Sequence, residues 1–136
     1  ELTETAVMLD PEDAFRVMNE LSDIGIRLSI DDFGTGYSSL SYLKQLPVDE
    51  IKIDRSFVKE MQNNNDDQVI VHTTLLMGHN LGLQVVAEGI EDIGTLQQLK
   101  LLGCDIAQGY HIARPMQATD FPQWLERYRE KKASDI

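Results

Sequence analysis

The sequence predicts an α/β fold in which short parallel strands alternate with helices. The main observation is a phrase that recurs along the chain: the end of a helix, a glycine, a mostly apolar strand, and one polar residue where the strand stops. A second observation is that residues at helical spacing fill the intervals between these strands. Regular alternation of this kind is typical of right-handed βαβ units and therefore of a parallel sheet.

Four copies of this phrase predict four strands. In three copies a glycine precedes the strand, because glycine readily takes the left-handed conformation that ends a helix. In the fourth copy Pro47 stands in its place and prevents the preceding helix from continuing. The predicted strand segments are 24–31, 46–53, 81–88 and 102–108. Glu1 would belong with them if it ended a further strand lying before the sequence.

Helices are predicted in the intervals between these strands. The first begins at the N-cap residue Asp10, followed by Pro11, which is favoured in a first helical turn. A short helix over 38–43 ends before Pro47, and the charged tail 130–136 is expected to fray. The stripes at helical spacing are Ala14, Phe15, Met18 and Leu21; Ile70, Thr74, Met77 and Leu81; Leu96, Leu99 and Leu102; and Phe121, Trp124, Leu125 and Tyr128.

The parallel sheet could close in two ways, as an open doubly wound sheet or as a barrel. The phosphate-binding fingerprint Gly-x-Gly-x-x-Gly is absent at the first turn, which favours the barrel. With 136 residues, the chain is long enough for one modest core but not for a second domain of ordinary size. Residues 1–136 are therefore one domain or a piece of one.

The composition restricts the partners of this chain. Twelve basic and 23 acidic residues give a net charge of −11, without a Lys and Arg cluster that could follow a nucleic acid backbone. Polymeric nucleic acid is excluded on this ground, whereas a small anion remains compatible because bound cations can reverse the sign of an acidic pocket. A single cysteine, Cys104, and the lack of a long apolar run indicate a cytoplasmic location.

Polar residues at the strand ends form a candidate site. These residues are Asp31 with Asp32, Lys52, Glu88 and Gln108, and the carboxyl ends of parallel strands meet at one edge. Adjacent acids repel each other unless a cation neutralises them. Oxygen ligands without a His or Cys cluster favour Mg²⁺ or Mn²⁺ over zinc. The pattern predicts metal-assisted hydrolysis of a phosphate ester.

Each of these residues also has a simpler interpretation. A lone polar residue at a strand end, such as Gln108, is more often just solvated. Lys52 could polarise or deprotonate a water or hold a phosphoryl oxygen, but it could equally belong to a structural ion pair. Residues 33–39 could cap the site as a mobile lobe, or they could form an ordinary Gly-Ser turn.

Five motifs in order resemble one known family over nearly the whole chain. The motifs are Glu-Leu-Thr-Glu at 1–4, Asp-Asp-Phe-Gly-Thr-Gly-Tyr-Ser-Ser at 31–39, Ile-Lys-Ile-Asp-Arg-Ser-Phe at 51–57, Ala-Glu-Gly-Ile-Glu at 87–91, and Gln-Gly-Tyr at 108–110 with Arg114-Pro115 after it. Together they are similar to the EAL domain, a phosphodiesterase that hydrolyses the bacterial messenger cyclic di-GMP to linear pGpG. The resemblance implies a TIM-like (β/α)8 barrel, of which about four βα units, its C-terminal portion, would lie here.

The resemblance also implies a two-metal site that holds Mg²⁺ or Mn²⁺. Glu1 and Asp31 would bind the first ion, and Asp31 would bridge to a second ion held by Asp32 and Glu88. Lys52 would act on the nucleophilic water as a general base, with Gln108 supporting that water.

Further residues would surround this site by the same resemblance. Glu4 would anchor the loop of Phe33, Gly34, Ser38 and Ser39, which in this family links substrate binding to metal binding and to dimerisation. The other substrate-side candidates are Asp54, Glu91 and Pro115.

The sequence departs from the family pattern at its start. The Glu-Ala-Leu signature and an Asn ligand should both precede Glu1, so we expect a weak first metal site and little hydrolysis by these residues alone. We expect the chain to pair with the upstream half of the barrel or with a second copy through exposed edges. Further signalling domains or a membrane tether could belong to the parent protein. Two alternatives remain: a degenerate EAL domain that only binds cyclic di-GMP or a protein, and an unrelated barrel with other metal chemistry.

Overall fold

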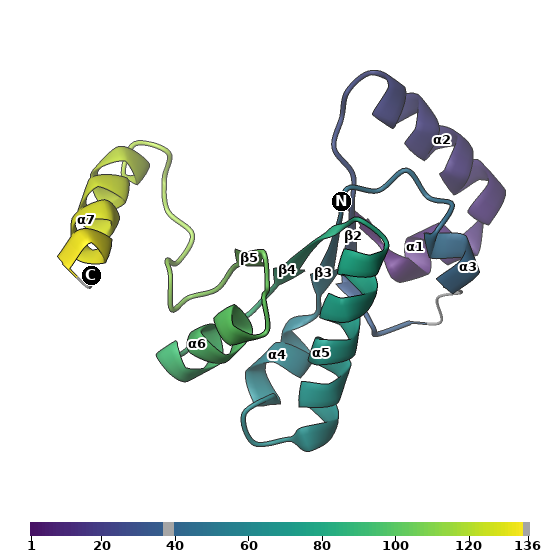
Figure 1. Cartoon of the computed structure of the whole chain (residues 1–136). Helices are drawn as coiled ribbons and strands as arrows, with labels where there is room; N and C mark the ends of the chain where they lie inside the picture. Colours follow the sequence, from purple (N-terminus) through teal and green to yellow (C-terminus); the bar gives the residue numbers. More distant parts are fainter. Residues whose placement is uncertain (37–39, 135–136) are drawn as a thin grey trace.

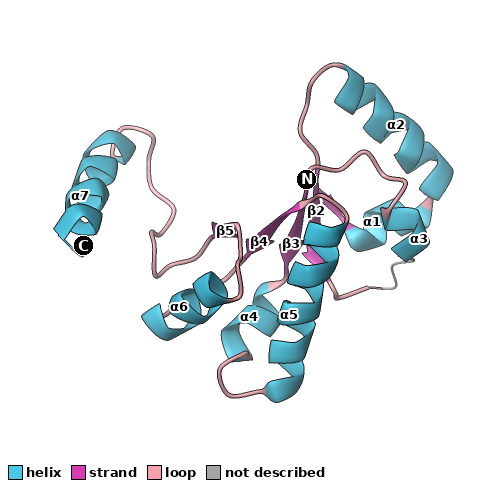
Figure 2. Cartoon of the chain, viewed as in Figure 1, coloured by secondary structure: helices cyan, strands magenta, loops and turns pink. Residues whose placement is uncertain are grey.

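Five parallel strands form one sheet in the computed structural model, which describes residues 1–36 and 40–134 (Figures 1 and 2). The strands are β1 (Leu2–Thr3), β2 (Ser29–Phe33), β3 (Glu50–Ile53), β4 (Gln84–Ala87) and β5 (Ile106–Ala107). Each strand pairs with the next in the chain, in the order β1-β2-β3-β4-β5. This sequential order is that of a barrel wall, because a doubly wound sheet reverses its strand order at a switch point. The predicted α/β fold with parallel strands is confirmed.

Six helices occupy the connections between the strands in the described residues, and a seventh follows β5. They are α1 (Glu4–Leu9), α2 (Pro11–Asp23), α3 (Leu40–Leu43), α4 (Arg55–Glu60), α5 (Asn65–Asn80), α6 (Ile93–Leu101) and α7 (Phe121–Ser134). Sequence reasoning missed α1 and α4, which are too short to show a stripe, although each has an N-cap residue, Thr3 and Asp54. Among the described residues no helix is both long and apolar enough to cross a bilayer.

The last helix, α7, continues to Ser134 among the described residues. Glu and Lys favour helix, and Lys131 and Lys132 in the last turn complement the negative end of the helix dipole. The fraying expected over 130–136 stays a prediction.

Local signals in the sequence set the element boundaries. The Asp10 carboxylate accepts a hydrogen bond from the Asp13 amide at 3.1 Å, which starts α2 as predicted. Gly25, Gly82 and Gly103 have φ angles of 87°, 75° and 82°, so the predicted left-handed helix ends are confirmed.

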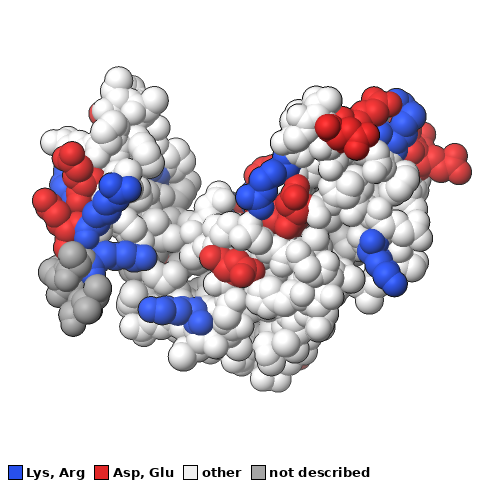
Figure 3. All heavy atoms as spheres, turned by 45° about the horizontal axis from the view of Figure 1, so that its top comes forward, with Lys and Arg blue, Asp and Glu red and all other residues white. Residues whose placement is uncertain are grey.

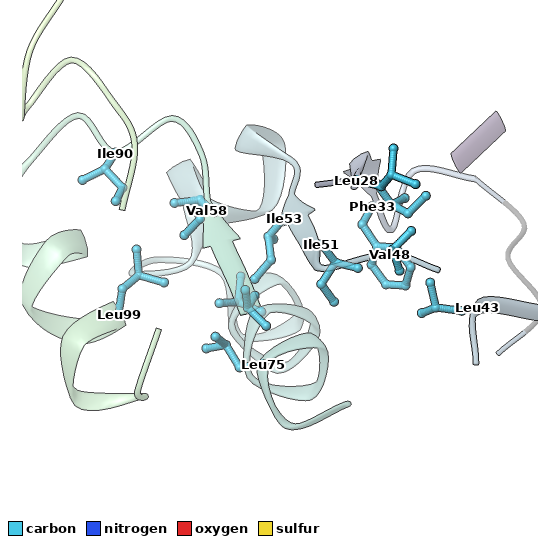
Figure 4. Close-up of a cluster of buried hydrophobic side chains, with 14 of the residues drawn as sticks. Leu28, Phe33, Leu43, Val48, Ile51, Ile53, Val58, Leu75, Ile90 and Leu99 are labelled. Atoms are coloured by element: carbon cyan, nitrogen blue, oxygen red, sulfur yellow. The ribbon is translucent and has the colours of Figure 1, made fainter. Parts of the chain in front are cut away.

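The hydrophobic core lies between the sheet and the helices that follow each strand. Figure 4 shows Ile51 and Ile53 of β3 at its centre, with Leu75 of α5 beneath them. Both isoleucines are fully buried, and Leu75 is 1% exposed. Since side chains on both faces of β3 are buried, β3 is an internal strand that fixes the positions of the strands beside it.

Packing of α5 should dominate the stability of the chain. We expect Leu75→Ala to lower the free energy of unfolding by about 2–5 kcal/mol, because it leaves a cavity under β3. The matched control is Leu76→Ala on the same helix, where the leucine is 53% exposed and the cost should stay within about 0.5 kcal/mol. Urea unfolding measures both, and equal destabilisation would contradict this packing.

Candidate metal centre at the strand ends

The ammonium group of Lys52 in β3 connects acidic side chains from the regions of β1, β2 and β4. Its Nζ atom lies 3.0 Å from Glu1 Oε1, 3.7 Å from Asp31 Oδ1 and 2.6 Å from Glu88 Oε1. Lys52 lies within β3, Asp31 within β2, and Glu88 directly after β4. The parallel register therefore brings these predicted residues together at one place.

Glu1 reaches this place in a different way from the one expected. Strand β1 is Leu2–Thr3, and Thr3 pairs with Asp31, so Glu1 precedes the strand rather than ending it. Strand β1 ends at Thr3 rather than at Glu1, because the Thr3 side chain caps α1 by accepting a hydrogen bond from the Ala6 amide at 3.1 Å.

Lys52 is held in its charged form. Burial by itself would lower the pKa of Lys52, but hydrogen bonds to Glu88 and Glu1 outweigh burial and raise that pKa. The side chain is only 6% exposed, and a buried ammonium needs such partners. In this arrangement the Lys52 ammonium donates hydrogen bonds. This fits both a structural ion pair and the binding of an anionic oxygen.

The acids around Lys52 outnumber it. Burial raises the pKa of Glu88 in spite of the ion pair with Lys52, and repulsion from Asp31 and Glu1 adds to this effect. The pKa of Asp32 is also raised, by burial first and then by Asp31 and Asp54. Three carboxylates, those of Glu1, Asp31 and Glu88, lie within ion-pair distance of this one ammonium, so the cluster holds more negative charge than one lysine neutralises.

An irregularity in β2 places two successive carboxylates on one side. Alternation along a regular strand would point Asp31 and Asp32 to opposite faces, but the pairing of β2 with β3 shifts between Ile30 and Phe33. Asp32 has a φ angle of 53°, in the left-handed region that few residues other than glycine adopt. Such local strain is found at functional sites, where the surrounding structure maintains it.

The resulting cluster suits a hard divalent cation. One carboxylate oxygen each from Asp31, Asp32 and Glu88 lie within 4.8 Å of one another. Carboxylates are the donors that Mg²⁺, Mn²⁺ and Ca²⁺ prefer, and a shared ion would relieve the charge excess. The donor set therefore fits the predicted metals.

Glu4 fixes the start of the loop that follows β2. Its carboxylate is 3% exposed and accepts hydrogen bonds from the Gly34 amide at 3.1 Å and the Gly36 amide at 3.2 Å. Phe33 is buried in the core, and Gly34 lies against the Phe57 ring. The loop is thus held on both sides next to the acidic cluster. Two other candidates for this loop, Ser38 and Ser39, lie outside the described residues.

Two of the remaining candidates lie close to the cluster. Asp54 caps α4, where it accepts hydrogen bonds from the amide and hydroxyl of Ser56, and it faces Asp32. Gln108 follows β5, and its backbone amide donates a hydrogen bond to the Ala87 carbonyl at 2.9 Å.

The other two lie further out. Glu91 forms an exposed ion pair with Lys59 at 3.6 Å, and Pro115 lies on the exposed segment between β5 and α7.

Sequence reasoning gave no role to Ser56 and Phe57, which position Asp54 and the Gly34 loop. Both residues lie inside the motif at 51–57, and that motif is the signal that could have found them. Their contacts come from α4, a helix that the pattern did not reveal.

Charges of both signs are mixed elsewhere on the surface. On the face drawn in Figure 3, acidic and basic side chains lie next to one another over α2 and α7, and broad areas between them are uncharged. Within α2, for example, Arg16 pairs with Asp13 and Glu20. On the face drawn, charges of opposite sign are therefore mixed, in contrast to the strand ends, where three acids lie around one lysine.

We expect Glu4→Ala to release the loop after β2. Loss of the buried acceptor leaves the amides of Gly34 and Gly36 without their partner, so their hydrogen exchange should accelerate about tenfold or more, as for a lost charge-assisted hydrogen bond. Glu12→Ala on the exposed side of α2 is the control and should leave both rates unchanged. Unchanged exchange in Glu4→Ala would show that the loop is held by other contacts.

The raised pKa of Asp32 predicts a pH-dependent effect of neutralising it. The folded, metal-free chain binds this proton more tightly than the unfolded chain, so ionised Asp32 destabilises the fold at neutral pH. In EDTA at pH 7.5, Asp32→Asn should raise the free energy of unfolding by on the order of 0.5 kcal/mol. The gain should vanish as the pH falls through the raised pKa towards the ordinary value of 3.8, where Asp32 itself becomes neutral.

Thermal unfolding at pH 7.5 and pH 4 measures this difference. The reference is the wild-type chain, unfolded at the same two pH values. A less stable Asp32→Asn variant at pH 7.5 would mean that the local charge excess is wrongly described.

The chain is similar to curated proteins of cyclic di-GMP signalling. It is 46% identical over 118 residues to the bifunctional diguanylate cyclase/cyclic di-GMP phosphodiesterase MucR of Pseudomonas aeruginosa, a match covering 87% of the chain and 17% of MucR. It is 40% identical over 129 residues to the cyclic di-GMP phosphodiesterase NbdA of the same bacterium, covering 95% of the chain and 16% of NbdA. The chain thus spans less than a fifth of these relatives.

Solved structures show the same fold. The MucR phosphodiesterase in complex with cyclic di-GMP superposes with a TM-score of 0.86 at 44% identity, covering 88% of this chain and 49% of that one. The manganese and cyclic di-GMP complex of BlrP1 from Klebsiella pneumoniae gives a TM-score of 0.75 at 38% identity, covering 83% of this chain and 29% of BlrP1. The five parallel strands are therefore part of a TIM-like barrel.

A family model described as the EAL domain matches residues 1–115, which is most of the chain. The match includes all five strands and the acidic cluster with Lys52. On this evidence the chain belongs to the EAL domain family.

Proposed function

We propose that this chain is part of a metal-dependent phosphodiesterase domain that hydrolyses cyclic di-GMP to linear pGpG. The observation that carries the proposal is the cluster of Asp31, Asp32 and Glu88 oxygens within 4.8 Å of one another, beside the ammonium of Lys52. A cyclic dinucleotide offers two phosphodiesters, and a cation cluster next to a buried lysine can bind and polarise one of them.

Mg²⁺ or Mn²⁺ would be held by Asp31, Asp32 and Glu88. Glu1 would bind the first of the two ions together with Asp31. Bound there, two such ions would supply an activated water and neutralise negative charge on the phosphoryl group. The BlrP1 structure, which contains manganese and cyclic di-GMP, supports this choice. A cation binds the ionised forms of Asp32 and Glu88, so the raised pKa of each carboxyl makes metal binding sensitive to acidification.

Lys52 has two possible parts in this chemistry. As an ammonium it donates a hydrogen bond to a phosphoryl oxygen and balances charge in the transition state. As a neutral amine it could take a proton from the attacking water. Burial is the largest influence on the Lys52 pKa and favours the neutral form, so engagement of Glu88 and Glu1 elsewhere would move Lys52 towards the base role.

The remaining candidates would arrange the loops around this centre. Glu4 would hold the loop after β2 in place, Gln108 would support the attacking water from the end of β5, and Asp54, Glu91 and Pro115 would lie on the substrate side. The chain spans 49% of the MucR phosphodiesterase structure. Its outer strands β1 and β5 would pair with further strands of the barrel or with a second copy.

A binding module without hydrolysis is the second candidate. The observation that favours it is the raised pKa of Lys52, because a lysine held as an ammonium by Glu88 and Glu1 cannot accept a proton. Such a domain would bind cyclic di-GMP or a protein partner and leave the phosphodiester intact.

The decisive test is hydrolysis by a complete barrel. The chain can replace the matching half of the MucR phosphodiesterase, to which it is 44% identical, and cyclic di-GMP turnover is then measured with Mg²⁺ or Mn²⁺. We expect turnover by the chimaera, and a loss of about 10²–10⁴-fold in kcat for Lys52→Ala and Asp31→Asn. Lys100→Ala, at an exposed lysine of α6, is the control and should keep full activity.

Other outcomes would decide between the candidates. Binding of cyclic di-GMP without turnover, although the MucR half is intact, would favour the binding module. Unchanged rates in both variants would remove the roles assigned to Lys52 and Asp31. Cleavage of another phosphoester with no action on cyclic di-GMP would mean that this barrel catalyses a different reaction.

A further inference from the structure

The chain segments that follow β4 and β5 remain joined beyond the ends of the strands. The last pair of the ladder is Ala87 with Ala107. Past it, the Gln108 amide donates to the Ala87 carbonyl at 2.9 Å, and the Ile90 amide donates to the Gln108 carbonyl at 3.2 Å. The His111 amide then donates to the Ile90 carbonyl at 3.0 Å. The two rim segments therefore form one backbone unit.

Ile90 fixes this unit to the core. Its side chain is fully buried and lies at the same end of the core as Leu99 of α6 (Figure 4). The residue two positions before it, Glu88, belongs to the acidic cluster. The path of the backbone between these two residues determines where the Glu88 carboxylate can lie.

Gly109 lies directly against the backbone of Ile90. A Cβ atom at Gly109 would lie 2.2 Å from the Ile90 carbonyl oxygen, 2.3 Å from its nitrogen and 2.7 Å from its carbonyl carbon. These three are main-chain atoms, so no side-chain rotation can relieve the contact. Gly109 is not among the described glycines with a positive φ, and the requirement for glycine is therefore steric.

We infer that Gly109 is a positioning residue for the metal centre: its bare backbone contact with Ile90 sets the place of the Glu88 carboxylate beside Asp31 and Lys52. This inference rests on the proposed function. It also means that the segments carrying Glu88 and Gln108 move together, because Gly109 directly follows Gln108 in the same backbone unit.

The contact is close enough to matter for the site. Restoring an allowed distance at Ile90 would shift one segment by about 1 Å, and a misplacement of this size can cost a site about 10²-fold. Such a shift would disturb the contacts of Glu88, whose amide donates to the Ile53 carbonyl at 3.3 Å and whose carboxylate lies 2.6 Å from Lys52.

The test compares Gly109→Ala with Gly103→Ala in the full chain. Gly103 lies before β5, at its other end, and has a φ of 82°. A methyl group added at Gly103 would have no neighbouring atom within 4 Å, so this substitution strains the local backbone without touching Ile90. Titration with MnCl₂ should show about tenfold or more weaker binding for Gly109→Ala. Gly103→Ala should bind Mn²⁺ as the wild type does.

A second readout reports the position of Glu88 without metal. In Gly109→Ala the amide resonances of Glu88 and Ile90 should shift, and the Ile90 and His111 amides should exchange faster. Wild-type Mn²⁺ affinity together with unchanged Glu88 resonances would overturn the inference. Equal loss of Mn²⁺ binding in Gly103→Ala would also overturn it, because general destabilisation would then explain the effect.

A third variant covers the case in which Gly109→Ala does not fold. Ile90→Val removes one buried methyl group and keeps the backbone contact, so its Mn²⁺ affinity should stay within about twofold of the wild type. A large loss would show that side-chain packing, and not the backbone contact, positions Glu88. If the wild-type chain alone binds no Mn²⁺, the same titration is made in the chimaera with the MucR half; no binding there would contradict the proposed function, while the Glu88 and Ile90 resonances still decide the role of Gly109.

Discussion

The buried ammonium of Lys52 is the interaction on which the candidate site depends. A charge in the interior must be paired, and this one is paired with Glu88, Glu1 and Asp31. Since the partners come from the regions of three different strands, the ion pairs also hold the strand ends together. The same arrangement leaves more carboxylate than one lysine can balance, and this excess makes the place attractive for a divalent cation.

Contacts in the surrounding structure offset the unfavourable energy of this arrangement. The left-handed backbone at Asp32 and its raised pKa are both unfavourable, yet they bring a third carboxylate to the cluster. Buried Glu4 holds the loop that follows, through the amides of Gly34 and Gly36. On the opposite side, the contact of Gly109 with Ile90 holds the segment that carries Glu88. The acidic cluster is therefore fixed from two directions by contacts that do not themselves involve a cation.

Much of the fold was predictable because its signals are local. The glycines before the strands and the N-cap at Asp10 act over one or two helical turns, where the sequence alone sets the conformation. Short elements such as α1 and α4 escaped, because six residues are too few to show a period.

The sequence by itself determined the parallel α/β fold, the family, and the residue types at the strand ends, because these depend on patterns along the chain. Only the tertiary structure decided how the residues meet. It showed that Lys52 is an ion-paired ammonium, that the pairing of β2 with β3 shifts where Asp31 and Asp32 lie, and that Gly109 lies against Ile90. These features depend on distances between residues far apart in the sequence and on the balance of burial against charge, and neither is encoded in local pattern.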